Sequence, residues 1–339
     1  MTYREQRTTG NPFRQEFLDS IHNLIEKKLA EAEETRRGFA KELLGNPQKA
    51  RGQFAQLLGW PLTEERTGIP KAELFHIVTD GDVDLFRVQI EIFEGFKFYG
   101  LLFKRTDGGK RPLVISQHGG LGSPEVCSTL LEGESSYNYN DMTQRILKYD
   151  VNVFAPQMLL WSKEEYGIDY DRKHLDAQLR LLGGSMAALE IYCLMRALDY
   201  FETQEYVDKE RMGMVGLSYG GMFTLYTAAL ETRLKAAVSS SFFCTRSENA
   251  DMPDWKYKGM AYNFYDAEVA MLVRPRKIYL AMGKDDPLFD SSKSVKEFET
   301  IKELCPDRDQ WAELQIFQGE HEFCPDDEFL NKFMKDMEA

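Results

Sequence analysis

The 339-residue sequence lacks several features that would assign a protein to a class directly. No uninterrupted apolar run approaches the roughly 18 residues that a membrane span needs. The first ten residues are too polar for a secretory signal. Its five cysteines form no CxxC pair, so neither a disulfide framework nor a zinc site is expected. We therefore expect a cytoplasmic protein with reduced thiols and no membrane partner.

The chain also has fewer basic than acidic residues. The chain carries 42 lysine and arginine residues against 55 aspartate and glutamate residues, a net charge of −13. Such a chain repels phosphate backbones and anionic lipid, so nucleic acid is excluded as a partner. There is no GxxxxGK[ST] loop and no GxGxxG that opens a helix after the first strand. Neither an organic cofactor nor a metal is expected.

The N-terminal region, residues 1–69, has a helical pattern and is predicted to be an extension of the main domain. Apolar residues recur there at spacings of three and four, which predicts one amphipathic helix face; they are Phe13, Phe17, Ile21, Leu24 and Ile25. Asn46 followed by Pro47 is typical of the start of a second helix. These helices could pack on the main domain, join two copies into a homo-oligomer, or shade an active site.

After residue 70 the hydrophobic period changes from helical to strand-like. Residues 75–98 alternate between apolar and polar, as half-buried antiparallel strands do. Short apolar runs of the buried-strand type then alternate with helical segments; the runs are 113–115, 151–155, 212–215, 234–238 and 277–282. This order predicts an α/β fold over residues 70–339, with a mostly parallel central sheet flanked by helices.

The motif with the clearest chemical meaning is Gly216-Leu217-Ser218-Tyr219-Gly220, which joins a predicted strand to a predicted helix. Glycines two residues on either side of a serine permit a very sharp strand-to-helix turn. Such a turn exposes the hydroxyl at the C-terminal edge of the sheet. An ordinary glycine-rich turn is the alternative, but the strand before and the helix after favour Ser218 as a nucleophile.

A serine nucleophile needs a base to accept its proton and an acid to orient that base. His321 follows the strand-like residues 312–317, so it lies in a loop at the expected sheet edge. Asp286 follows the strand 277–282 and is the preferred acid, with Asp285 as the alternative; Asp290 is better explained as a helix cap. The resulting order of serine, aspartate and histidine is that of an α/β-hydrolase triad.

Acyl transfer also requires N–H donors for the developing oxyanion. One is expected from Tyr219, directly after the serine. The second is expected from the glycine-rich loop after residue 116, where Gly120 is preferred and Gly119 is the alternative. In that loop His118 is expected to have a positional role. The other histidines are not expected to take part in catalysis; they are His22, His76 and His174.

Two loops at the same sheet edge contain candidates for substrate binding. One is residues 155–161, where Leu160 and Trp161 are expected to be exposed. The other follows the strand 234–241 and begins with Phe242 and Phe243. We predict that Trp161, Phe242 and Phe243 contact the substrate, although an aromatic loop can equally be a packed cover over the core. Cys244 has no adjacent base and is not expected to be a nucleophile.

Taken together, these segments resemble the α/β-hydrolase superfamily, and within it the dienelactone hydrolase and prolyl-oligopeptidase-like esterases, especially bacterial acetyl xylan esterase-like proteins. Residues 273–289 are similar to that family's acid segment, which supports Asp286, and residues 319–323 are similar to its histidine segment. One departure is Tyr219, which stands where glucuronoyl esterases usually have arginine.

This resemblance, together with the motifs, implies a serine esterase that cleaves a small carboxylic ester through an acyl-enzyme. The acyl group is expected to be acetyl or similar, on a carbohydrate or aryl alcohol. A peptidase or a carbon–carbon bond hydrolase using the same triad is the alternative within catalysis. A non-catalytic binding or scaffold protein is the alternative outside it, and the presence of serine, acid, base and glycine loop argues against that reading.

Overall fold

The computed structural model describes residues 1–133, 135–246 and 255–338. Within these ranges nine strands form one sheet in the order β1-β2-β3-β5-β4-β6-β7-β8-β9. The strands are β1 (Lys71–Asp80), β2 (Val83–Phe93), β3 (Phe96–Arg105), β4 (Arg111–Gln117), β5 (Asn152–Pro156), β6 (Val207–Leu217), β7 (Leu234–Ser240), β8 (Lys277–Gly283) and β9 (Ala312–Phe317). Strands β4 to β9 run parallel, whereas β1, β2 and β3 are antiparallel. The predicted α/β architecture is confirmed.

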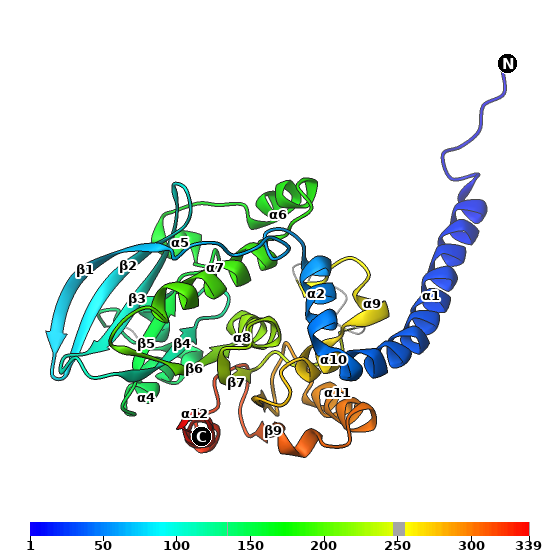
Figure 1. Cartoon of the computed structure of the whole chain (residues 1–339). Helices are drawn as coiled ribbons and strands as arrows, with labels where there is room; N and C mark the ends of the chain where they lie inside the picture. Colours follow the sequence, from blue (N-terminus) through cyan, green and yellow to red (C-terminus); the bar gives the residue numbers. More distant parts are fainter. Residues whose placement is uncertain (134, 247–254, 339) are drawn as a thin grey trace.

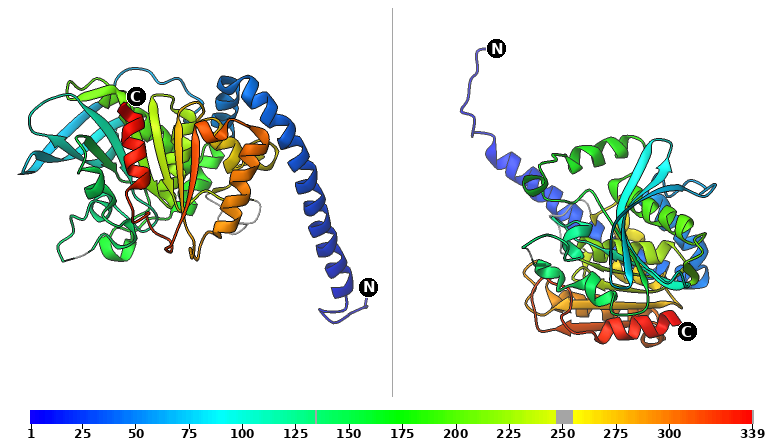
Figure 2. Two further views of the ribbon diagram at one scale, coloured as in Figure 1. Left: turned by 90° about the horizontal axis from the view of Figure 1, so that it is seen from below. Right: turned by 90° about the vertical axis from the view of Figure 1, so that its left-hand side faces the viewer.

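Helices cover both faces of this sheet (Figures 1 and 2). One face packs on α7 (Met186–Phe201), α8 (Tyr219–Leu230) and α11 (Ser291–Leu304). The opposite face packs on α3 (Pro124–Cys127), α4 (Met142–Ile146) and α12 (Glu328–Glu338). Because side chains alternate along a strand, Leu113 and Ile115 belong to the first core and Val114 to the second.

Several short helices lie in the connections between these elements. Helices α5 (Lys163–Tyr166) and α6 (Arg172–Leu181) stand between β5 and α7, while α9 (Met260–Asn263) and α10 (Asp266–Met271) precede β8. Single 3-10 turns occur at Tyr137–Tyr139 and Arg308–Gln310. Among the helices in the described ranges, none combines the length and the apolar character needed to cross a membrane.

The N-terminal region forms the two predicted helices, α1 (Asn11–Gly45) and α2 (Pro47–Leu58). The side chain of Asn46 accepts a hydrogen bond from the Lys49 N–H, and Pro47 begins the helix, so the predicted start of α2 is confirmed. Helix α2 and the C-terminal part of α1 pack on the main domain, with Phe39 and Phe54 in the core. This part of the extension therefore packs on the main domain, which was the first of the three alternatives.

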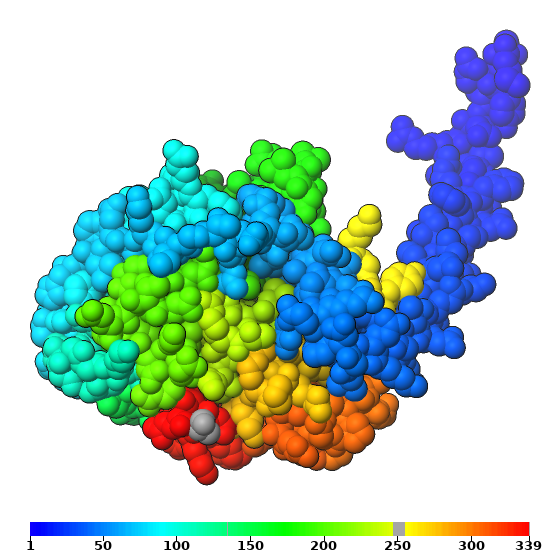
Figure 3. Space-filling model, viewed as in Figure 1, coloured from blue at the N-terminus to red at the C-terminus, as the bar shows by residue number. Residues whose placement is uncertain are grey.

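The N-terminal part of α1 instead projects away from the body as an arm (Figures 1 and 3). Its apolar stripe is exposed, which the helical pattern alone could not decide. We call these residues the apolar arm face; they are Phe13, Phe17, Leu18, Ile21, Leu24, Ile25 and Leu29, between 37% and 76% exposed. Contiguous apolar patches are rarely left exposed on monomeric soluble proteins, so an uncovered stripe is an unusual arrangement.

Buried charged groups fix the C-terminal half of α1 to the body. The guanidinium of Arg36 lies 3.2 Å from Glu268 Oε1 and covers the Tyr265 ring at 3.9 Å. Nearby, Glu297 accepts a hydrogen bond from the Ala267 N–H. Burial raises the pKa of Glu268 to about 7 and that of Glu297 to about 8, because a carboxylate loses its hydration there. We therefore expect the stability of this junction to depend on pH.

Candidate active site

Ser218 occupies the turn between β6 and α8 with φ 60° and ψ −120°, a conformation that residues with a side chain rarely adopt. The flanking glycines are needed sterically. A Cβ on Gly216 would lie 2.2 Å from the Gly220 carbonyl oxygen, and one on Gly220 would lie 2.1 Å from the Gln117 oxygen. The sequence predicts an exposed serine, but only 8% of Ser218 is exposed, because neighbouring strand ends and loops pack around the turn.

The candidate acid and base are in direct contact. His321 Nδ1 lies 2.8 Å from Asp286 Oδ2. The other oxygen of Asp286 accepts hydrogen bonds from the Leu288 and Phe289 N–H groups, at 2.8 and 3.0 Å. The Asp286 side chain is fully buried, so the charged carboxylate depends on these donors.

The alternative acid faces elsewhere. Asp285 is exposed, and its carboxylate accepts a hydrogen bond from the Gln318 side chain rather than from His321. Asp290 caps helix α11 by accepting a hydrogen bond from the Ser292 N–H, as predicted. The His321 ring stacks on Phe289, with ring centroids 5.7 Å apart. The geometry thus selects Asp286 as the partner of His321.

Backbone contacts bring the histidine segment to the serine turn. The Ser218 N–H donates to the Ser240 carbonyl at 2.9 Å. The Ser240 and Ser241 hydroxyls donate to the carbonyl of Glu322, the residue after His321, at 3.4 and 3.0 Å. Between the described side chains of Ser218 and His321 there is no hydrogen bond in this structure. Catalytic hydrogen bonds are often long before substrate binds, so this third contact stays a prediction.

The glycine loop after β4 lies against the same turn. A Cβ on Gly119 would lie 3.0 Å from Ser218 Cβ, and one on Gly120 would lie 3.4 Å from the Tyr219 ring. The Gly119 N–H already donates to the Tyr139 hydroxyl at 2.8 Å. This bond leaves Gly120 as the better candidate for an oxyanion donor beside Tyr219, whose N–H belongs to the first turn of α8. Sequence reasoning missed Tyr139, which carries no motif.

His118 holds the glycine loop in place. It is fully buried, its Nδ1–H donates to the Gly119 carbonyl at 2.8 Å, and its Nε2 accepts from the Met158 N–H and the Gln157 amide at 3.0 and 3.1 Å. Burial lowers the pKa of His118 to about 4, so the ring is neutral at physiological pH. This geometry matches the positional role expected from the sequence.

The other histidines lie away from the turn on exposed surfaces of α1, β1 and α6; they are His22, His76 and His174. Cys244 is buried, and burial raises the pKa of its thiol to about 12, which disfavours the nucleophilic thiolate.

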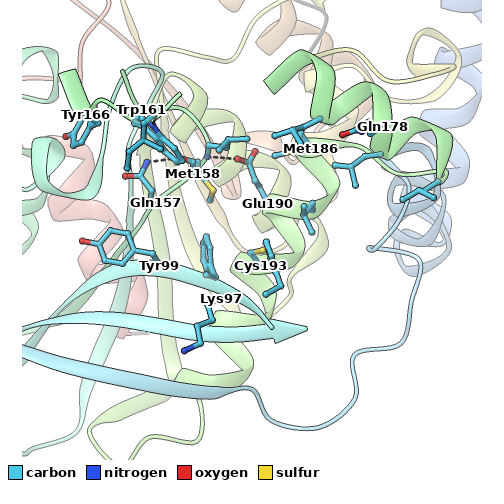
Figure 4. Close-up of a pocket in the computed structure, with 18 of the residues that line it drawn as sticks. Lys97, Tyr99, Gln157, Met158, Trp161, Tyr166, Gln178, Met186, Glu190 and Cys193 are labelled. Carbon is cyan, nitrogen blue, oxygen red and sulfur yellow. Dashed lines mark hydrogen bonds between the residues drawn. The ribbon is translucent and has the colours of Figure 1, made fainter. Parts of the chain in front are cut away.

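The predicted substrate contacts separate into two groups. Phe242 and Phe243 are fully buried, and Phe242 packs edge-on against Trp255 and Phe289. Their burial contradicts the expectation of substrate contact and gives them the packed-cover role. Leu160 is also buried, contrary to the expected exposure. Trp161, by contrast, lines an apolar cavity of about 920 Å³ (Figure 4).

The fold and the geometry of the site can be compared with those of known proteins. The chain has the α/β-hydrolase fold, as the sequence resemblance predicts. The model of the prolyl oligopeptidase family matches residues 190–321, a range that includes Ser218, Asp286 and His321. Several solved structures share the fold, among them two named as esterases. The glucuronoyl esterase from Solibacter usitatus is 14% identical with a TM-score of 0.64, over 87% of this chain and 93% of its own.

The second is acetyl xylan esterase 1 from Thermoanaerobacterium sp. JW/SL YS485, 15% identical with a TM-score of 0.58, over 86% of this chain and 93% of its own. In sequence, the chain is similar to a Bacillus subtilis (strain 168) protein named as a hydrolase, YtaP, with 30% identity over 197 residues. That match covers 55% of this chain and 63% of YtaP, which is less than two thirds of its length.

Proposed function

We propose that this protein is a serine hydrolase that cleaves carboxylic ester bonds through an acyl-enzyme on Ser218. The observation that carries the proposal is the strained serine turn at the end of β6, beside a hydrogen-bonded aspartate–histidine pair at the ends of β8 and β9. Strained backbone conformations of this kind cluster at active sites. The esterase names of the structural neighbours support the same reaction class.

In the proposed reaction the Ser218 hydroxyl attacks the ester carbonyl while His321 Nε2 takes its proton. The C–O bond to the alcohol then breaks, and His321 returns the proton to the departing alkoxide. Water attacks the acyl-enzyme with the same base, releasing the carboxylic acid and free Ser218. Acetyl is the acyl group that the sequence suggests, on a carbohydrate or aryl alcohol.

Asp286 has the task of fixing the His321 tautomer. Its carboxylate accepts the Nδ1–H, so that Nε2 carries the lone pair that must receive the serine proton. The N–H groups of Gly120 and Tyr219 are proposed to hold the oxyanion, where one donor contributes about 10²- to 10³-fold in kcat.

The cytoplasmic location expected from the sequence also stays a prediction.

The proposal is tested with a substrate panel and a covalent probe. The panel contains an acetyl ester, an aminoacyl amide and a β-diketone, and the probe is a fluorophosphonate. We expect turnover of the ester, with labelling of the wild-type chain and none of Ser218→Ala. Equal labelling of both chains would overturn the nucleophile assignment.

A peptidase is the second candidate, because the matching family model carries the name of the prolyl oligopeptidases. Faster cleavage of the aminoacyl amide than of the ester would favour it over the esterase.

A further inference from the structure

An apolar cavity of about 920 Å³ lies between β3, the loop after β5, α6 and the first turns of α7 (Figure 4). Volumes of this size are typical of small-molecule sites. Most of its wall consists of aliphatic, aromatic and sulfur-containing side chains, among them Phe98, Met158, Trp161, Leu175, Leu179 and Met186.

Both carboxylates of the cavity wall already have hydrogen-bond partners within the protein. Glu190 pairs with Arg172 at 2.7 Å and accepts the Leu159 N–H at 2.9 Å. Glu125 accepts the Tyr99 hydroxyl at 2.5 Å. Lys97, the lysine of the wall, pairs with Glu73 at 2.8 Å. Because these polar groups have partners within the protein and the rest of the wall is mostly apolar, the cavity suits an uncharged, apolar occupant.

Four contacts join this cavity and its neighbours to the candidate active site. Gln157 and Met158, which line it, donate to His118 in the glycine loop. Trp161 forms an isolated bridge with Leu121, the residue after Gly120.

The fourth contact involves Arg172, which does not line the cavity but binds the cavity residue Glu190. Arg172, the partner of Glu190, lies with its guanidinium 5.9 Å from the centre of the Tyr219 ring. Both proposed oxyanion donors therefore have a neighbour that touches the cavity or its wall.

The strand order determines which part of an ester faces this cavity. Asp286 and His321 follow β8 and β9, on the β7 side of the serine strand β6. Because His321 must protonate the leaving alcohol, the alcohol lies on that side. The acyl chain, bonded to the same carbonyl carbon, points away from His321. That direction leads toward β4 and β5, beyond which the cavity lies.

We propose that this cavity is the acyl pocket of the enzyme, and that it takes an apolar, straight-chain acyl group longer than acetyl. This inference rests on the proposed function. Strands β6 and β5 are two positions apart, about 10 Å. An acyl chain on Ser218 therefore has room to lengthen toward the loop after β5, which forms part of the cavity wall. The acetyl group expected from the sequence would leave the cavity unused.

The test uses p-nitrophenyl esters from acetyl to decanoyl, so that only the acyl group changes. Each methylene buried in the cavity is expected to raise kcat/KM by about fourfold, as a burial of about 0.8 kcal/mol implies. Between acetyl and hexanoyl esters we therefore expect a gain on the order of 10². A profile that is flat or falls with length overturns the inference.

A matched pair of variants locates the effect. Leu175→Glu places a carboxylate in the cavity wall, and we expect the hexanoyl-to-acetyl ratio of kcat/KM to fall by about 10-fold or more. Leu181→Glu is the control, since Leu181 stands on the same helix, is 87% exposed and does not line the cavity. Leu179→Trp, which fills the cavity without adding charge, should lower the same ratio. An unchanged ratio in both Leu175→Glu and Leu179→Trp contradicts the proposal.

Failure of this inference can be told apart from failure of the proposed function. Ser218-dependent hydrolysis of the acetyl ester without a preference for length rejects only the acyl pocket. An absence of ester hydrolysis together with an unlabelled Ser218 rejects both.

Discussion

Replacing Asp286 by asparagine is the sharpest perturbation of the proposed triad. The side chain is fully buried, and one of its oxygens accepts two backbone N–H groups. An asparagine keeps its oxygen toward those donors and therefore turns its NH₂ group toward His321 Nδ1. That contact requires an unprotonated Nδ1, so the proton moves to Nε2 and the base can no longer accept from Ser218.

The expected loss in kcat is about 10⁴-fold, or roughly 5.5 kcal/mol of transition-state stabilisation. Initial rates of ester hydrolysis measure it, with thermal unfolding as the check on the fold. Asp285→Asn is the matched control. It makes the same chemical change one residue earlier, on an exposed carboxylate that contacts Gln318, and should leave kcat within about twofold. A large loss in Asp285→Asn with a small loss in Asp286→Asn would refute the assignment of the acid.

Three further predictions concern the loop, the charged junction and the arm. Tyr139→Phe removes the acceptor of the Gly119 N–H and should lower kcat about 10-fold with little change in KM, since an unpaired buried N–H costs about 1–3 kcal/mol; unchanged kinetics would show that the hydroxyl does not position the loop. Because the folded pKa of Glu297 is about 8 and its ordinary value is 4.5, the folded chain holds a proton that the unfolded chain loses between these values. The free energy of unfolding should therefore fall as pH rises through that window, by up to about 1.4 kcal/mol per pH unit. Denaturant titrations from pH 5 to 9 should show this slope, and Glu297→Gln should reduce it; an equal slope in that variant would contradict the explanation. We also propose that a second copy of the chain covers the apolar arm face, because pairing two such faces would bury on the order of 1,200 Å², the lower limit of stable interfaces; light scattering should report dimers that Ile21→Lys with Ile25→Lys converts to monomers, and a monomeric wild type would refute it.

Much of the fold could be predicted because local patterns and global packing agree. The run Leu113-Val114-Ile115 is apolar throughout because β4 is buried on both faces of a parallel sheet. The serine turn was predictable for a steric reason, since only glycine fits at positions 216 and 220. Asp286 and His321 were identified because each follows a strand, and the ends of parallel strands share one edge.

The remaining features depend on packing that no local pattern encodes. Phe242 and Leu160 lie in apolar loops of the kind that often bind a ligand, but both side chains are buried in the core. The helical spacing of the arm predicts an apolar stripe without indicating whether the body covers it. Tyr139 lies in a polar segment, and its contact with Gly119 arises only when that segment folds over the loop. The cavity draws its wall from β3, the loop after β5, α6 and α7, which are distant in sequence.

The central claim is that Ser218 becomes acylated during turnover. Rapid acid quenching of the enzyme with a p-nitrophenyl ester, followed by mass measurement of the peptides, tests it most directly. We expect the peptide that contains Ser218 to gain the mass of one acyl group, and the corresponding peptide of Ser218→Ala to gain none. Turnover of the ester with the acyl group on another residue would contradict it.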